Sequence, residues 1–302
     1  MPSLSSRLPA LLGVFALAGV GSCASCGNSA RAAALIEETL QVRVHGETLH
    51  GIPFDQSMTV DSVREAGAAR RPWLILLHGR AADAAARARL SVRNYPANSR
   101  YFAAKGFAVL IPLRVGYGAT GGPDVEFTGD CHFKHFADGV GPALSETTQL
   151  IDYAAHLPYV DPTRGLIVGD SFGGLVAIGA AAARLAGLKA VVNIAGGDGG
   201  DPLAHPDAPC RADQLEQTFG HFGAATRMPT LWMYSANDRL WGADLPRRWY
   251  AAFTGAGGTG RFEALPADRH NGHFIFTRNA AAWQPPFERF LNSLGRQLLL
   301  PP

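Results

Sequence analysis

The chain has 302 residues, of which 47% are hydrophobic and 17% charged, and its formal net charge is +2 at pH 7. This near-neutral balance gives no reason to expect nucleic acid or an anionic membrane surface as a partner. The length suffices for one large hydrophobic core, because α/β folds often reach about 250 residues as a single domain. We therefore expect a single domain over residues 33–302, after a targeting segment.

Residues 1–32 have the pattern of a signal peptide. Arg7 precedes an apolar run, Leu8–Val20, which is too short to span a bilayer comfortably and is followed by small residues. Ala30-Arg31-Ala32 is an A-x-A cleavage site that would release a soluble protein, and we favour this processing. The alternative is the lipoprotein-like box Val20-Gly21-Ser22-Cys23, which would end the leader at residue 22 and leave Cys23 lipidated. Either route predicts export to the periplasm or the exterior.

Four cysteines support the prediction of export. Cys23 and Cys26 form a C-x-x-C that we assign to the leader rather than to a redox site. Cys131 and Cys210 stay in the mature chain, and in an oxidising compartment they predict a disulfide; two buried thiols are the alternative. The run Cys131-His132-x-x-His135 could suggest a metal. No second cluster completes a set of three or four ligands, so we predict neither a metal nor another cofactor.

From about Leu40, short apolar runs alternate with longer helical stretches, a pattern typical of a mostly parallel central sheet with helices on both faces. An antiparallel pair of strands is expected at the start. Two irregular stretches, Leu113–Gly141 and Gly196–Arg211, follow strands at the carboxyl edge of the sheet, where ligands bind in such folds. The predicted strands are Leu40–Val44, His50–Phe54, Trp73–Leu77, Ala108–Pro112, Gly165–Val168, Ala190–Ile194, Thr230–Tyr234 and Phe262–Leu265. The predicted helices are Ala97–Lys105, Leu144–His156, Phe172–Ala186, Ala212–Phe219, Ala243–Thr254 and Ala280–Leu298.

The segment GLIVGDSFGG (Gly165–Gly174) contains G-x-S-x-G between an apolar strand and a helix. A nucleophilic serine needs a sharp turn that lifts its Oγ above the sheet, and glycines two residues to either side leave room for that turn. The helix N-terminus that follows offers N–H groups to a developing oxyanion. The motif therefore predicts Ser171 as a nucleophile; the alternative is a structural or phosphate-binding glycine-rich turn.

Several segments together resemble bacterial dienelactone-hydrolase-like α/β-hydrolases: LLHGR (Leu76–Arg80), LRVGYGATGGP (Leu113–Pro123), GDSFGG, WMYSAND and NGHFIF. The resemblance extends from about Trp73 to the end of the chain. It implies the α/β-hydrolase fold and a catalytic triad in the order Ser, Asp, His. Dienelactone hydrolase itself uses a cysteine nucleophile, so its lactone substrate does not carry over to Ser171. Asp170 also departs from the family, and its carboxylate either perturbs the site or faces a basic partner.

The general base is predicted in the loop DRHNGHFIF. We favour His273, which follows a tight Asn-Gly turn and stands in a GH-x-F pattern similar to that of the family; His270 is the alternative. Asp238 ends the apolar run TLWMYSAND, where this fold places the acid that orients the base. Asp198 and Asp201 are rivals for that role. A helix-capping role for Asp238 is also open.

Two backbone N–H groups should form the oxyanion hole. One belongs to Phe172, directly after the nucleophile, and the other to Arg80, in the loop after the strand that ends at Leu77. The Arg80 side chain is not needed for this role; it could bind a substrate carboxylate or form a surface ion pair.

These residues lead to three functional hypotheses. The first is an exported serine hydrolase of the carboxylesterase type, acting on a small ester through an acyl-enzyme. The second is a serine peptidase related to the prolyl oligopeptidases, whose catalytic domains share G-x-S-x-G-G, although this chain lacks the length for their propeller. The third is a non-catalytic exported binding protein with the same fold.

Overall fold

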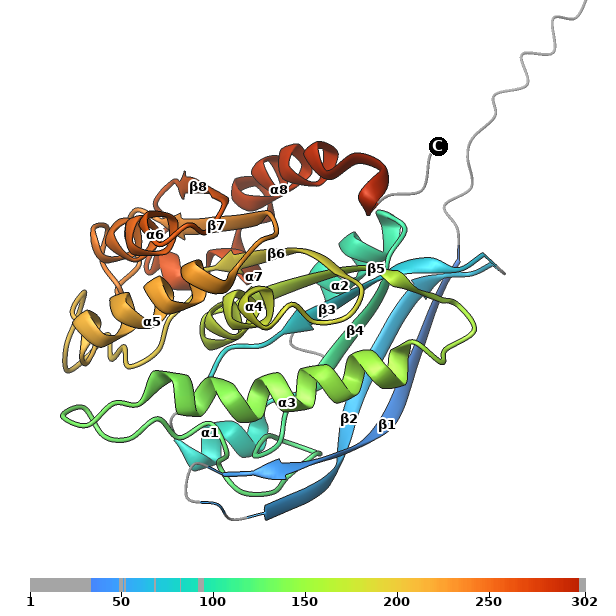
Figure 1. Ribbon diagram of the computed structural model, residues 1–302, viewed down its shortest axis with the longest axis horizontal. Coiled ribbons are helices and arrows are strands. Elements are labelled where there is room, and N and C mark those ends of the chain that lie inside the picture. The colour runs from blue at the N-terminus through green and yellow to red at the C-terminus, as the bar shows by residue number, and fades with distance from the viewer. Residues whose placement is uncertain are drawn as a thin grey trace, which may run out of the picture. The chain divides into compact units, whose positions relative to one another are not determined.

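The computed structural model describes residues 34–298, except 49–50, 52, 68, 82 and 92–94. An eight-stranded sheet forms its centre, in the order β1-β2-β4-β3-β5-β6-β7-β8 (Figure 1). β2 is antiparallel to β1 and β4, and all later neighbours are parallel. The strands are β1 (Leu35–Glu47), β2 (Pro53–Glu65), β3 (Arg71–Leu77), β4 (Ala108–Leu113), β5 (Val160–Asp170), β6 (Leu188–Ile194), β7 (Thr230–Ser235) and β8 (Gly260–Leu265).

Helices cover both faces of the sheet (Figure 1), as the sequence predicts. Side chains of β3 alternate between two cores: Trp73, Ile75 and Leu77 join the core under α3–α6, and Leu74 and Leu76 join the core under α2, α7 and α8. Burial on both faces explains why these strands are continuously apolar. The helices are α1 (Ala84–Arg89), α2 (Pro96–Ala104), α3 (Phe136–Ala154), α4 (Phe172–Ala183), α5 (Ala212–Ala225), α6 (Leu245–Gly255), α7 (Ile275–Arg278) and α8 (Ala280–Leu294), with short 3-10 helices η2 (Gly272–Phe274) and η3 (Gly295–Gln297).

Two predicted elements differ most from the observed boundaries. The second strand occupies Pro53–Glu65, so the predicted His50–Phe54 overlaps only its first residues; residues 49, 50 and 52 lie outside the described part of the chain. Helix α3 begins at Phe136 rather than Leu144. The buried Phe136 and Val140 anchor its first turns in the core, and this packing outweighs the low helix propensity of the glycines and of Pro142.

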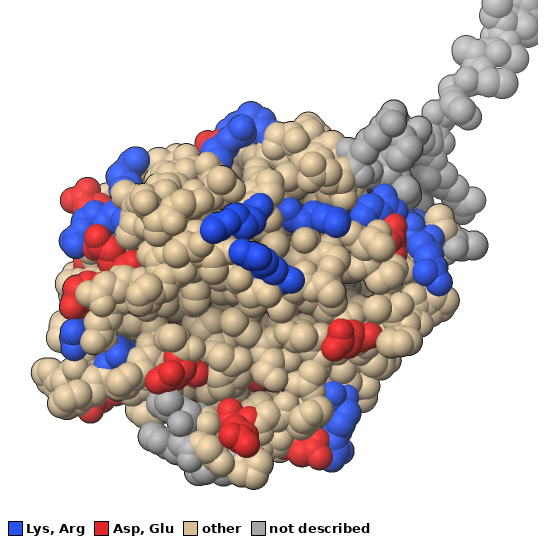
Figure 2. Space-filling view, viewed as in Figure 1, with Lys and Arg blue, Asp and Glu red and all other residues tan. Residues whose placement is uncertain are grey.

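The surface shows no dominant sign of charge on the face drawn in Figure 2. Lys and Arg side chains and Asp and Glu side chains both occur there, separated by wide uncharged areas. Within the described ranges, none of the helices combines the length and the apolar character needed to cross a bilayer.

Candidate active site

Ser171 lies between the end of β5 and the start of α4, with φ 55° and ψ −123°. A positive φ is strained for a residue with a side chain, and such strain persists only where the surroundings hold it. Here the Ser171 N–H donates to the Ile194 carbonyl at 2.9 Å on the neighbouring strand β6. The turn therefore has the sharp strand-to-helix geometry that the sequence predicts for a nucleophile.

The glycines of G-x-S-x-G are required by close backbone contacts. A Cβ atom on Gly169 would lie 2.0 Å from the Gly173 carbonyl oxygen, and one on Gly173 would lie 2.3 Å from that of Leu77. Both distances are far below van der Waals contact. The motif is thus explained by the packing of α4 against β3 and β5.

The structure brings His273 to Ser171. His273 lies in η2, where its backbone N–H donates to Asn271 Oδ1 at 3.0 Å. Its Nε2 lies 2.9 Å from Ser171 Oγ, and its Nδ1 lies 3.0 Å from Asp238 Oδ2. His270, the alternative base, is exposed. Of the two histidines, His273 therefore has the geometry of a general base.

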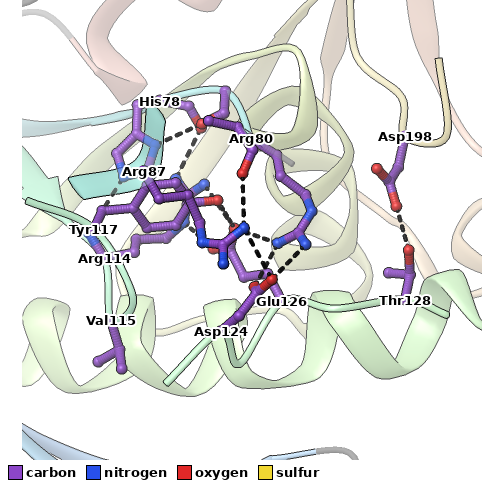
Figure 3. Close-up of polar contacts among 12 residues, drawn as sticks. His78, Arg80, Arg87, Arg114, Val115, Tyr117, Asp124, Glu126, Thr128 and Asp198 are labelled. Atoms are coloured by element: carbon purple, nitrogen blue, oxygen red, sulfur yellow. Dashed lines mark hydrogen bonds and ion pairs between the residues drawn. The ribbon is translucent and has the colours of Figure 1, made fainter. Parts of the chain in front are cut away.

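Asp238 is fully buried in the turn that follows β7, and its Oδ1 accepts hydrogen bonds from the N–H groups of Leu240 (2.9 Å) and Trp241 (3.3 Å). With one oxygen held by backbone and the other on His273, the carboxylate fixes the orientation of the imidazole. The two rivals are engaged elsewhere: Asp198 accepts from Thr128 Oγ1 at 2.6 Å (Figure 3), and Asp201 accepts from backbone in its own loop.

The charges around His273 favour its protonated form. Burial lowers the pKa of His273, but the adjacent Asp238 carboxylate raises it, and Asp170 adds to that effect, so the net shift is upward. An imidazole in this setting accepts a proton from serine more readily than one that is merely buried.

The loop after β3 lies against the nucleophile. A Cβ atom on Gly79 would be 3.0 Å from Ser171 Cβ, so the backbone of this loop faces the serine. Phe172 is the first residue of α4, and its N–H has no acceptor within the helix. The Arg80 side chain reaches Asp124, with contacts of 2.7 and 2.8 Å (Figure 3). Of the two roles that the sequence left open for this side chain, the structure shows an ion pair, and the pair is partly buried rather than exposed.

A buried polar cluster that the sequence did not predict supports this loop (Figure 3). Arg114 donates through Nη1 to the His78 carbonyl at 2.9 Å and pairs with Glu126, which also accepts from Tyr117 Oη at 2.7 Å. The Arg114 N–H donates to His78 Nε2, so His78 Nδ1 carries the proton and donates to the Gly79 carbonyl. Burial, with Arg114 nearby, lowers the pKa of His78 and keeps it neutral. The only sequence signal was an arginine directly after a buried strand.

A pocket of about 330 Å³ opens beside Ser171. The predicted disulfide, Cys131–Cys210, is confirmed, with Cα atoms 5.0 Å apart, and both cysteines line this pocket. The disulfide joins the loop between β4 and α3 to the loop between β6 and α5.

In the described part of the chain, no three His, Cys, Asp or Glu side chains are grouped so that they could hold a metal.

Comparison with solved structures identifies the fold. A Klebsiella pneumoniae protein named as a dienelactone hydrolase matches with TM-score 0.57 at 17% identity, over 87% of this chain and 98% of its own. An acetyl xylan esterase from a Paenibacillus species matches with TM-score 0.56 at 15% identity, over 86% and 89%. An acylaminoacyl peptidase from Pyrococcus horikoshii matches with TM-score 0.55 at 13% identity, over 87% of this chain but 42% of its own. No family model and no curated protein matches the sequence. The chain has the α/β-hydrolase fold, as the resemblance predicts.

Proposed function

We propose that this protein is an exported serine hydrolase that cleaves small carboxylic esters through an acyl-enzyme. The observation that carries the proposal is the continuous contact from Ser171 Oγ to His273 Nε2 (2.9 Å) and from His273 Nδ1 to Asp238 Oδ2 (3.0 Å). Serine is inert near neutral pH unless a base accepts its proton, and this relay supplies the base and the group that orients it.

Acylation follows from these contacts. His273 Nε2 takes the Ser171 Oγ proton while Oγ bonds to the ester carbonyl carbon, whose π electrons move to oxygen. Asp238 stabilises the imidazolium, and the backbone N–H groups of Phe172 and Arg80 donate to the oxyanion. When the carbonyl re-forms, the bond to the alcohol oxygen breaks, and that oxygen takes the proton from His273. The acyl group stays on Ser171 as an ester.

Deacylation repeats the sequence with water. His273 Nε2 takes a proton from water, the hydroxyl oxygen adds to the acyl carbon, and the second tetrahedral oxyanion uses the same two N–H groups. Its collapse breaks the bond to Ser171 Oγ, which regains the proton from His273. The products are a carboxylic acid and the free enzyme, and no cofactor takes part.

Replacement of Ser171 by alanine tests the proposal. We expect Ser171→Ala to abolish hydrolysis of p-nitrophenyl acetate and covalent labelling by a fluorophosphonate probe, because both need the activated hydroxyl. Mass spectrometry should locate the probe on Ser171 in the unaltered protein. Unchanged turnover in the variant would refute the assignment, and an unaltered protein that takes up no probe would support a non-catalytic binding protein.

A serine peptidase is the second candidate, because the fold also matches that of an acylaminoacyl peptidase. The same relay can attack an amide, so the site alone does not separate the two reactions. Release of product from Pro- or Ala-linked peptide amides at a rate comparable to ester cleavage would favour the peptidase. We expect ester cleavage to dominate.

Export rests on two features of the chain. The N-terminal segment has the pattern of a signal peptide, and the Cys131–Cys210 disulfide fits an oxidising compartment. A lipid anchor at Cys23 remains the alternative to cleavage before residue 33.

A further inference from the structure

The residue before the nucleophile carries a partly buried carboxylate that the relay above does not use. Asp170 Oδ2 accepts a hydrogen bond from Tyr95 Oη at 3.1 Å. Its Oδ1 is buried and has no hydrogen-bond partner among the residues that the structure describes. A buried carboxylate with one unsatisfied oxygen costs stability, so its position next to Ser171 needs a reason.

Tyr95, Asp238 and His273 act on Asp170, and two further ionisable groups, His78 and Arg114, lie in the loops after β3 and β4. His78 follows β3, and its lowered pKa keeps it neutral. Arg114 follows β4, but it pairs with Glu126. Tyr95 precedes α2, and burial raises the pKa of its hydroxyl, so it stays protonated and donates. The remaining two groups are Asp238, after β7, and His273, in η2. Among these groups, His273 is the one that can change from neutral to positively charged beside Asp170, and the only other carboxylate that acts on it is Asp238.

We propose that Asp170 is a positioning residue of the proton relay: held by Tyr95, its carboxylate acts on the His273 imidazole as a second negative charge beside Asp238. The inference rests on the proposed function and goes beyond it, because Asp170 lies outside the Ser-His-Asp triad. The hydrogen-bond partner of Asp170 is a tyrosine. Of the two alternatives left open by the sequence, this favours a carboxylate that perturbs the site over one that forms an ion pair with a basic side chain.

The expected consequence is a pH effect with a definite sign. The base works when His273 is neutral, and a nearby negative charge favours the imidazolium, so Asp170 moves the acid limb of kcat/KM to higher pH. Burial raises the pKa of Asp170 to about 6, so its negative charge is lost as the pH falls through that value. The two groups titrate as a coupled pair. At higher pH the ionised Asp170 stabilises the imidazolium that forms during attack.

Asp170→Asn tests this role. We expect the acid limb of kcat/KM to move to lower pH by about half to one unit, and the plateau kcat to fall about threefold to tenfold, with little change in KM. Tyr95→Phe removes the donor to Asp170, so the carboxyl stays protonated to higher pH. This variant should shift the limb in the same direction by a smaller amount, because Asp170 still ionises eventually.

Glu146→Gln is a matched control. Glu146 is fully buried, and its Oε1, like Asp170 Oδ1, is buried without a partner among the described residues, but Glu146 does not act on His273. Its replacement should leave the acid limb in place. A folded Asp170→Asn protein whose limb is unmoved, or is moved to higher pH, overturns the proposal. If that variant does not fold, an unmoved limb in Tyr95→Phe overturns it equally.

A second measurement separates this inference from the proposed function. The pKa of His273 can be followed by NMR of the 15N-labelled imidazole, with no substrate present. A lower value in Asp170→Asn supports the electrostatic role even if the protein hydrolyses no ester, in which case the proposed function alone fails. An unchanged value, in a protein whose ester hydrolysis depends on Ser171, overturns the role of Asp170 alone.

Discussion

Two histidines three residues apart differ completely in their contacts. His273 is buried between Ser171 and Asp238, and His270 is exposed in the same loop. We expect His273→Ala to lower kcat for p-nitrophenyl acetate on the order of 10³-fold or more, because nothing else in the relay can accept the serine proton. His270→Ala is the matched control in the same loop and should keep kcat within about twofold. Steady-state kinetics at pH 8 measure both.

Two outcomes of this pair of variants would contradict the assignment of His273 as the base. A large loss in His270→Ala, with His273→Ala close to the unaltered protein, would exchange their roles and require the loop to rearrange in solution. Equal, small losses in both variants would remove the relay altogether.

Among individual residues, the sequence led to those that lie in a recognisable local pattern. Ser171 lies in a glycine motif whose spacing reflects backbone contacts, and His273 and Asp238 follow recognisable turns and strands. Tyr95 and the pairing of Arg114 with Glu126 were not predicted, because they depend on which loops meet in space. Arg80 was assigned for its backbone, and its side chain has a partner, Asp124, that no local pattern indicates.

Among the elements, the buried parallel strands were the easiest to predict. Each is a short apolar run, because helices cover both faces of the sheet. Strand β2 was mostly missed, since its sequence mixes polar and apolar residues, as an antiparallel strand near the edge of the sheet allows. The early start of α3 was missed because glycines and a proline interrupt a pattern that only the core packing of Phe136 and Val140 restores.

The disulfide acts on two loops rather than on the sheet. Cys131 and Cys210 line the pocket, whereas Ser171, Asp238 and His273 come from other segments. We expect the double variant Cys131→Ser, Cys210→Ser to lose about 2–4 kcal/mol of stability, a drop in Tm of about 5–10 °C. Because the loops shape the pocket and not the relay, KM for esters should rise more than kcat falls.

Reduction of the unaltered protein provides the matched comparison for this prediction. A thiol reductant should reproduce the rise in KM in the unaltered protein and change nothing in the double variant. A double variant with the same Tm and KM as the unaltered protein would show that the two loops keep their positions without the covalent link.

For the whole molecule, the described residues that form the two cores and the candidate site all follow residue 33. Strand β1 begins at Leu35, and residues 33–302 form one compact unit. Every residue of the relay, the oxyanion region and the pocket lies beyond residue 78. We therefore expect residues 1–32 to be dispensable for folding and for catalysis.

A protein that begins at residue 33 tests this organisation. We expect it to unfold at the same Tm as the exported protein, within about 2 °C, and to hydrolyse p-nitrophenyl acetate at the same kcat. Mass spectrometry of the exported protein adds the processing site: a mature N-terminus at residue 33 supports the soluble form, and a diacylglyceryl group on Cys23 supports the lipoprotein. A shortened chain that fails to fold would mean that residues before 33 contribute to the domain, and the predicted boundary would then be wrong.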